Sequence, residues 1–129
     1  MIKFTDILHK EKSDVVVQQF EDDIKRKHPN LDTFGVYMNH SKNSLYISDL
    51  YVKDKFRGIG VGTSVMKDII KFADLNKLPI VLIPEPDGKL SVKKLIQFYM
   101  KFGFVVNRGK HINYNLSDTF AVTMYRIPK

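Results

Sequence analysis

Three glycines at alternate positions, Gly58, Gly60 and Gly62, follow Arg57 in the stretch FRGIGVG. Glycine has no Cβ, so a ligand that approaches this stretch can reach backbone N–H groups directly. The residues that follow have helical periodicity, and the first turn of a helix presents unpaired amides and the positive end of the helix dipole. This combination predicts a phosphate-binding site. The alternative is that the glycines only allow a tight turn between a strand and a helix.

The spacing of these glycines excludes two common nucleotide-binding motifs. A dinucleotide fingerprint needs Gly-x-Gly-x-x-Gly, but position 63 is Thr, and the Gly-Lys-Ser/Thr of a P-loop is absent. The stretch does match Arg/Gln-x-x-Gly-x-Gly/Ala, through Arg57, Gly60 and Gly62. This is the pyrophosphate-binding signature of the GCN5-related N-acetyltransferases (the GNAT family), which the chain resembles.

The resemblance extends over most of the chain, about residues 31–127. The segment LYISDLYVKDKFRGIGVGTSVMKDII looks like the family's central strand, glycine loop and following helix. A second segment, LIQFYMKFGFVV, is similar to the family segment in which an aromatic–Tyr pair precedes Gly-Phe. The resemblance implies an α/β fold, with a central mixed sheet that contains two splayed strands and is flanked by about three helices.

Acetyl-CoA is the cosubstrate that the resemblance implies. In the family, its pantetheine arm lies between the central strand and the strand after the glycine helix. Carried over to this chain, backbone groups of Leu50 and Val52 would contact the pantetheine. The diphosphate would be surrounded by Arg57, Gly58, Ile59, Gly60, Val61, Gly62 and Thr63.

The distribution of charge fits a phosphorylated ligand. Residues 52–129 hold fourteen Lys and Arg against six Asp and Glu, whereas residues 1–51 hold seven against eight. The second part of the chain therefore favours an anion. The alternative is that these cations are only a solvated surface.

Tyr99 is the clearest candidate for chemistry, because it matches the tyrosine that in many family members returns a proton to the departing thiolate. A phenol with an ordinary pKa near about 10 is protonated at neutral pH and can act as this acid. The alternative is that Tyr99 is one more ring on the apolar face of its helix.

A general base is harder to assign. Polyamine-type members of the family carry Glu-Asp on the central strand, but here the pair is Ser48 and Asp49. Asp49 is the candidate for attracting a cationic amine or accepting its proton, although strict strand alternation would point it away from Ser48. Tyr46 and Tyr51 are candidates for lining the acceptor site, and the alternative is that they serve cross-strand packing. Two acids in the loop after the buried strand, Glu85 and Asp87, are the other acids near the predicted cleft.

Composition limits the other classes of protein. The 129 residues are 43% hydrophobic, which is enough for one domain that spans residues 1–129. No apolar run has the length of a membrane span, and the first residues lack the apolar centre of a signal peptide, so a cytoplasmic protein is expected. The chain has no cysteine, which excludes a cysteine acyl-enzyme, and its four histidines lack the spacing of a metal site.

The pattern along the chain predicts mixed helices and strands. Helices are expected from Ser13, after Gly62 and over LSVKKLIQFYMKFGF, with Gly103 at the end of the third. An antiparallel pair is expected for TFGVYMNH and NSLYISDLYV, a buried central strand for LPIVLIP, and a final hairpin for FVVNRG and FAVTMYRIP. The first residues, MIKF, are read as an edge strand.

These observations predict an enzyme that moves an acetyl group from acetyl-CoA to a primary amine by direct attack in a ternary complex. The acceptor is left open between a small amine and a protein amine, and a homodimer is left open as well. One alternative is a non-catalytic CoA-binding or interaction protein on the same scaffold. Another is a nucleic-acid-binding module, suggested by the net charge of +7 but lacking a clustered basic helix or an aromatic RNA motif.

Overall fold

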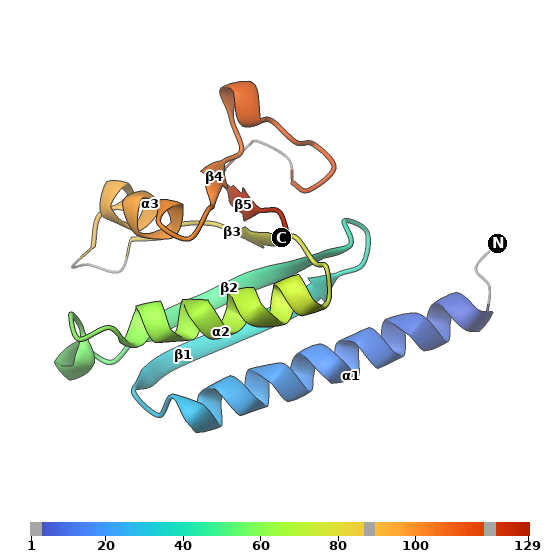
Figure 1. Ribbon diagram of the computed structural model, residues 1–129, viewed down its shortest axis with the longest axis horizontal. Helices are drawn as coiled ribbons and strands as arrows, with labels where there is room; N and C mark the ends of the chain where they lie inside the picture. The colour runs from blue at the N-terminus through green and yellow to red at the C-terminus, as the bar shows by residue number, and fades with distance from the viewer. Residues whose placement is uncertain (1–3, 87–89, 118–120) are drawn as a thin grey trace.

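The computed structural model describes residues 4–86, 90–117 and 121–129, with side chains from residue 10 onward. Three helices and five strands make up the described fold, and the strands form one mixed sheet in the order β1-β2-β3-β5-β4 (Figure 1). The elements are α1 (Phe4–Lys27), β1 (Leu31–Asn39), β2 (Ser44–Val52), α2 (Val61–Leu75), β3 (Ile80–Leu82), α3 (Val92–Met100), β4 (Val105–Val106) and β5 (Met124–Arg126), with 3₁₀ turns η1 (Asp54–Phe56) and η2 (Gly109–His111). This mixed sheet with three helices confirms the predicted α/β fold.

The strand pairing also agrees with the predictions. β1 and β2 are antiparallel, β2 and β3 are parallel, and β5 is antiparallel to both β3 and β4. All three residues of β3 are buried, as expected for a central strand covered on both faces.

Helices α1 and α2 lie side by side over one face of the sheet (Figure 1). The rings of Phe20 in α1 and Phe72 in α2 stack with centroids 4.1 Å apart, and His28 Nε2 lies 2.8 Å from a carboxylate oxygen of Asp68. The opposite face carries a smaller cluster, which consists of Val81, Leu116 and Tyr125 with Tyr46 packed against them.

The first helix is longer than predicted. It begins at Phe4 rather than at Ser13, so the prediction of an edge strand is wrong for Phe4, and the other residues of that strand lie outside the described part of the chain. No Pro or Gly interrupts residues 4–27, and Ser13 is therefore an interior residue of the helix rather than its cap. The N-terminal part of α1 extends beyond the edge of the sheet (Figure 1).

Helix α3 ends in the way predicted for Gly103. The Phe104 N–H donates to the carbonyl of Tyr99 at 3.4 Å and the Gly103 N–H to that of Met100 at 3.1 Å, which is the Schellman pattern. Gly103 has a φ of +90°, and the rings of Tyr99 and Phe104 lie against each other with centroids 5.7 Å apart. This C-terminal cap fixes Tyr99 relative to the strand that follows.

Strands β2 and β3 separate half-way along β2. Their paired residues end at Ile47 and Leu82, whereas β2 continues to Val52. A β-bulge stands at the same place, because Val36 pairs with Ile47 and Gly35 pairs with Asp49, leaving Ser48 as the extra residue. This confirms the predicted splay and opens a gap at the C-terminal half of β2.

Candidate functional site

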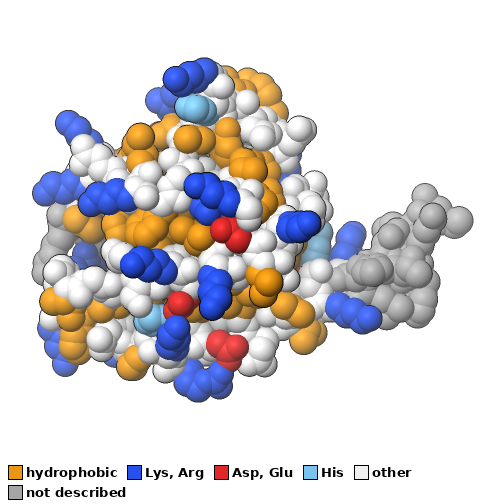
Figure 2. All heavy atoms as spheres, viewed as in Figure 1, with side chains coloured by type: hydrophobic (Ala, Val, Ile, Leu, Met, Phe, Trp, Pro, Cys, Tyr) orange, Lys and Arg blue, Asp and Glu red, His pale blue; other side chains and the backbone are white. Residues whose placement is uncertain are grey.

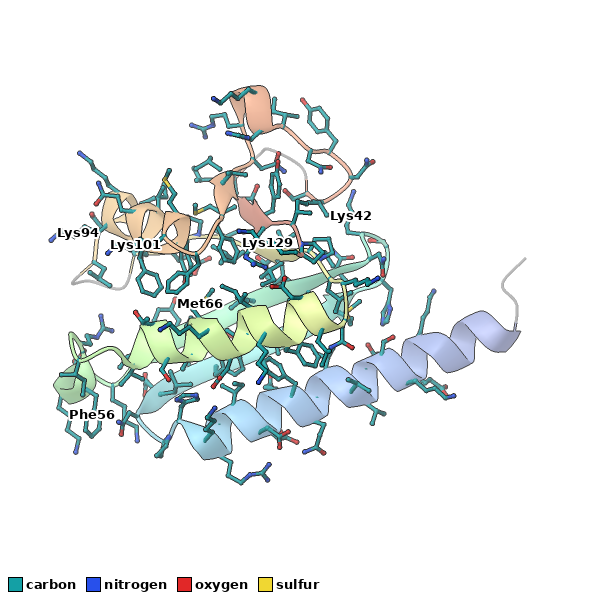
Figure 3. The ribbon with its side chains drawn as sticks, viewed as in Figure 1. Lys42, Phe56, Met66, Lys94, Lys101 and Lys129 are labelled. Carbon is teal, nitrogen blue, oxygen red and sulfur yellow. The ribbon has the colours of Figure 1, made fainter. Side chains whose placement is uncertain are left out.

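A hollow of about 520 Å³ lies between the C-terminal half of β2, the glycine loop and α3. Lys94 marks α3, one of the elements that bound it, and Phe56 marks η1, which directly precedes the glycine loop; both lie at the same end of the molecule (Figure 3). Its lining consists of Leu50, Val52, Arg57, Gly58, Gly60, Val61, Gly62, Thr63, Leu90, Leu95, Phe98 and Tyr99.

The hollow brings together most of the residues that the sequence singled out for acetyl-CoA. The exception is Ile59, which is 68% exposed and does not line it. Sequence reasoning missed the apolar wall formed by Leu90, Leu95 and Phe98. Leu95 and Phe98 were expected only as part of the apolar face of a helix, because a side chain that lines a ligand site has the same periodicity as one in the core.

The glycine loop leaves the start of α2 open. Gly60 is the N-cap of this helix with a φ of +90°, and it offers no side chain to accept hydrogen bonds from the first amides. The first turn also holds no acidic residue. Gly58 has a φ of +77°, and a Cβ on either glycine would meet no atom within 4 Å. The loop thus presents backbone amides and a positive dipole end beside open space.

Gly62 differs from the two glycines before it. It lies in the first turn of α2 with no left-handed backbone, so the turn does not require a glycine there. A Cβ at this position would lie 3.5 Å from Phe98 Cζ, which is ordinary contact. The explanation that the glycines serve only a tight turn therefore accounts for Gly58 and Gly60 but not for Gly62.

Arg57 is held at the entrance of the loop. Its Nε lies 3.2 Å from Asp54 Oδ1, and its side chain is only 22% exposed. Its backbone N–H donates to the carbonyl of Asp54 at 3.3 Å, so Asp54 contacts both the side chain and the backbone of Arg57.

Tyr99 lies where the large hollow meets a smaller cavity. Its side chain is 8% exposed, and its ring contacts Phe98 edge-on with centroids 5.2 Å apart. The helix that carries it has Ser91 as its N-cap, whose Oγ accepts a hydrogen bond from the Lys94 N–H at 3.2 Å. The ring is therefore fixed by packing, and it borders both spaces.

The smaller cavity, of about 40 Å³, lies where β2 and β3 separate. It is large enough to hold water. Its lining brings the two described candidate acids, Asp49 and Glu85, together with Tyr51 and Tyr99. The other candidate acid of the loop, Asp87, lies outside the described residues.

The bulge changes how Asp49 is presented. A Cβ on Gly35 would lie 2.6 Å from Ser48 Oγ and 3.2 Å from Asp49 Oδ2, so both side chains reach the same point. The expectation from alternation, that Asp49 points away from Ser48, is therefore wrong. Asp49 also borders a second hollow of about 520 Å³, which is lined by residues at the end of α1 and the start of β1, including Asp32 and Thr33.

Residues 21–106 match the family described as the acetyltransferase (GNAT) domain. The chain belongs to this GNAT family. The matched range contains α2, α3, the glycine loop and β2, and so includes the elements that form the large hollow. No curated protein sequence matches the chain significantly.

Solved structures share the GNAT fold with this chain. The anti-CRISPR protein AcrVA5 is 22% identical, with 71% of this chain and 85% of that protein covered, at a TM-score of 0.54. Ard1 from Thermoplasma volcanium is 20% identical, with coverages of 83% and 76% and a TM-score of 0.52. A GNAT-family acetyltransferase from Staphylococcus aureus Mu50 is 18% identical, with coverages of 74% and 58% and a TM-score of 0.53. At these identities the likeness establishes the fold alone.

Two further features of this GNAT chain concern its surface charge and its helices. On the face drawn in Figure 2, Lys and Arg side chains are numerous and acidic ones are few. Among the described residues, no helix is both long enough and apolar enough to cross a membrane.

Tyr46 has an unusual environment on the opposite face of the sheet from α1 and α2. Its pKa is raised above the ordinary value of 10.0, first by burial, and then by Tyr37 and the carboxylates of Glu85 and Asp49. The phenol therefore stays protonated at neutral pH, and its surroundings disfavour further negative charge.

Proposed function

We propose that the chain is an N-acetyltransferase that takes its acetyl group from acetyl-CoA. The observation that carries this proposal is the large hollow, because one space collects β2, the glycine loop and Tyr99. Its apolar wall suits a pantetheine arm, and the open amides at the start of α2 suit a diphosphate.

Leu50 and Val52 support the pantetheine part of this proposal. Both line the hollow on the stretch of β2 that no longer pairs with β3, so this stretch of backbone is available to a ligand that enters the gap. The arm would then extend from the glycine loop toward Tyr99.

The residues around the gap supply the groups that acetyl transfer needs. A neutral amine nitrogen attacks the thioester carbonyl, a C–N bond forms, and the C–S bond breaks. The amine gives up one proton, which Asp49 accepts either directly or through water in the small cavity. Tyr99, at the junction of the two spaces, donates a proton to the sulfur that leaves.

Calorimetry with acetyl-CoA, CoA and a nucleic acid is the direct test. Acetyl-CoA should bind with a Kd in the micromolar range and raise the melting temperature, since a ligand selective for the folded state stabilises it. A thiol-release assay with a panel of amines would then measure transfer. The proposal would be overturned if acetyl-CoA and CoA both produced no heat and no thermal shift. Binding without transfer would identify a CoA-binding protein instead.

A further inference from the structure

A pair of tyrosines lies on the face of the sheet that α1 and α2 do not cover. Tyr37 and Tyr46 are register partners on β1 and β2, and their ring centroids are 5.1 Å apart. Tyr37 is 49% exposed, whereas Phe34 and Val36 of the same strand are buried on the other face. The pair therefore presents aromatic surface to solvent close to the bulge.

Two carboxylates border the same region. Asp49 and Glu85 line the small cavity with Tyr99, and both are exposed at its outer side. A Cβ on Gly35, two residues before Tyr37 on β1, would lie 3.2 Å from Asp49 Oδ2, so this carboxylate lies on the same face of the sheet as the tyrosine pair. The raised pKa of Tyr46, to which both carboxylates contribute, agrees with this placement. In a chain with a net charge of +7, this local gathering of negative charge runs against the overall charge of the protein.

We propose that Tyr37, Tyr46, Asp49 and Glu85 form an acceptor platform that selects amines carrying a second positive charge. The inference rests on the proposed acetyl transfer and names the class of acceptor. Asp49, beside Tyr99, meets the amine that reacts, which must lose a proton. The second ammonium keeps its proton and is attracted by Glu85 and by the faces of the two rings.

The outer hollow beside Asp49 is the rival place for the second charge. It is lined by Lys25, by His28 and by two acids, Asp32 and Asp49. Lys25 pairs with Glu21 at 3.5 Å and His28 with Asp68 at 2.8 Å. Both places offer two carboxylates and share Asp49, but the acceptor platform adds the two tyrosine rings and its four residues include no lysine, so it is the more favourable surface for a cation.

The test compares 1,4-diaminobutane with butylamine, which share the reacting primary amine and differ in the distal ammonium. Each is titrated calorimetrically into the full chain with and without CoA, and kcat/KM for acetylation is measured in parallel. The diamine should bind at least about tenfold more tightly than butylamine, and Glu85→Gln should reduce this preference to about threefold or less. Asp22→Asn, which removes an exposed acid of α1, should leave the preference unchanged.

The aromatic part of the platform has its own matched pair of variants. Tyr37→Leu should lower the affinity for the diamine about two- to fivefold, whereas Tyr37→Phe, which keeps the ring, should not. Equal binding of both amines to the wild type would overturn the inference. Loss of the preference in Asp32→Asn with its retention in Glu85→Gln would also overturn it and assign the second charge to the outer hollow.

Failure of the underlying proposal is seen separately. The calorimetric preference for the diamine is read without CoA as well as with it, so it decides the inference even if acetyl-CoA does not bind. Failure of acetyl-CoA to bind overturns the proposed acetyl transfer, and an absent diamine preference overturns the acceptor platform.

Discussion

At the scale of single residues, the three glycines of the loop are not equivalent. Gly58 and Gly60 have positive φ angles, so local geometry alone explains them. Gly62 lies in the first turn of α2, where alanine is the better helix former by up to about 1 kcal/mol, and its neighbours leave room for a Cβ. A ligand that approaches the first turn of α2 would explain why this position has no side chain.

Gly62→Ala should therefore separate stability from binding. We expect the free energy of unfolding without ligand to rise by about 0.5 to 1 kcal/mol, because alanine is the better helix former. Affinity for acetyl-CoA should fall about tenfold, because the new methyl group stands between the amides and the ligand. Urea denaturation and calorimetry measure the two effects, and unchanged affinity would mean that Gly62 does not face the cosubstrate. Gly60→Asp should abolish binding of acetyl-CoA, because it adds a negative charge beside the diphosphate. It should also lower the free energy of unfolding, because residue 60 has a positive φ that is unfavourable for a residue with a Cβ.

Tyr99→Phe tests the proposed acid. The ring keeps its packing against Phe98 and Phe104, so the variant should fold and bind acetyl-CoA as the wild type does. Turnover should fall about ten- to a thousandfold because the proton donor is lost. Single-turnover kinetics would measure the chemical step, and a normal rate there would assign Tyr99 to packing alone.

At the scale of elements, the sequence was sufficient for the turn of the glycine loop, the positions of the strands along the chain and the end of α3, because each has a local signal. Glycines, alternation and a Gly-Phe pair act through the backbone near them. The bulge at Ser48 was not predicted, since it depends on the register with β1 and no residue of β2 marks it. The start of α1 was placed too late because Ser13 is also compatible with a helix interior.

Gly103 tests how far the end of α3 depends on its cap. Its φ of +90° is unfavourable for residues with a Cβ, although the nearest atom to that Cβ, Arg126 Nε, would be 3.7 Å away. Gly103→Ala should thus lower the free energy of unfolding by about 1 to 2 kcal/mol through backbone strain alone. Gly103→Asn should cost less, since asparagine tolerates this conformation better. Equal stability of all three proteins in urea would show that the cap is dispensable.

At the scale of the whole molecule, one buried arginine ties the end of the chain to two helices. Arg126 on β5 is 5% exposed, donates from Nη1 to Asp74 Oδ1 of α2 at 2.7 Å, and donates from Nε to the Phe102 carbonyl after α3 at 2.9 Å. The lysine surplus of the second part of the chain does not predict this contact, because the sequence does not show which arginine is buried. The contact connects the two helices that border the large hollow.

Removing the partner of this arginine should destabilise the protein in a pH-dependent way. The hydrogen bond with Arg126 holds the pKa of Asp74 below its ordinary value of 3.8, so the charged form stabilises the fold above that value and the contribution is lost as pH falls through the lower, folded-state pKa. At pH 7, Asp74→Asn should therefore lower the free energy of unfolding by about 2 to 3 kcal/mol, since a buried guanidinium loses its counter-charge. Between about pH 4 and about pH 2 the difference from the wild type should shrink, because protonation removes the same charge from the wild-type protein.

Asp74→Leu combined with Arg126→Met should be more stable than Asp74→Asn alone, as it leaves no unpaired charge. Urea denaturation across this pH range measures all three proteins, and a difference from the wild type that stays constant down to about pH 2 would show that the carboxylate of Asp74 does not stabilise the fold through its charge.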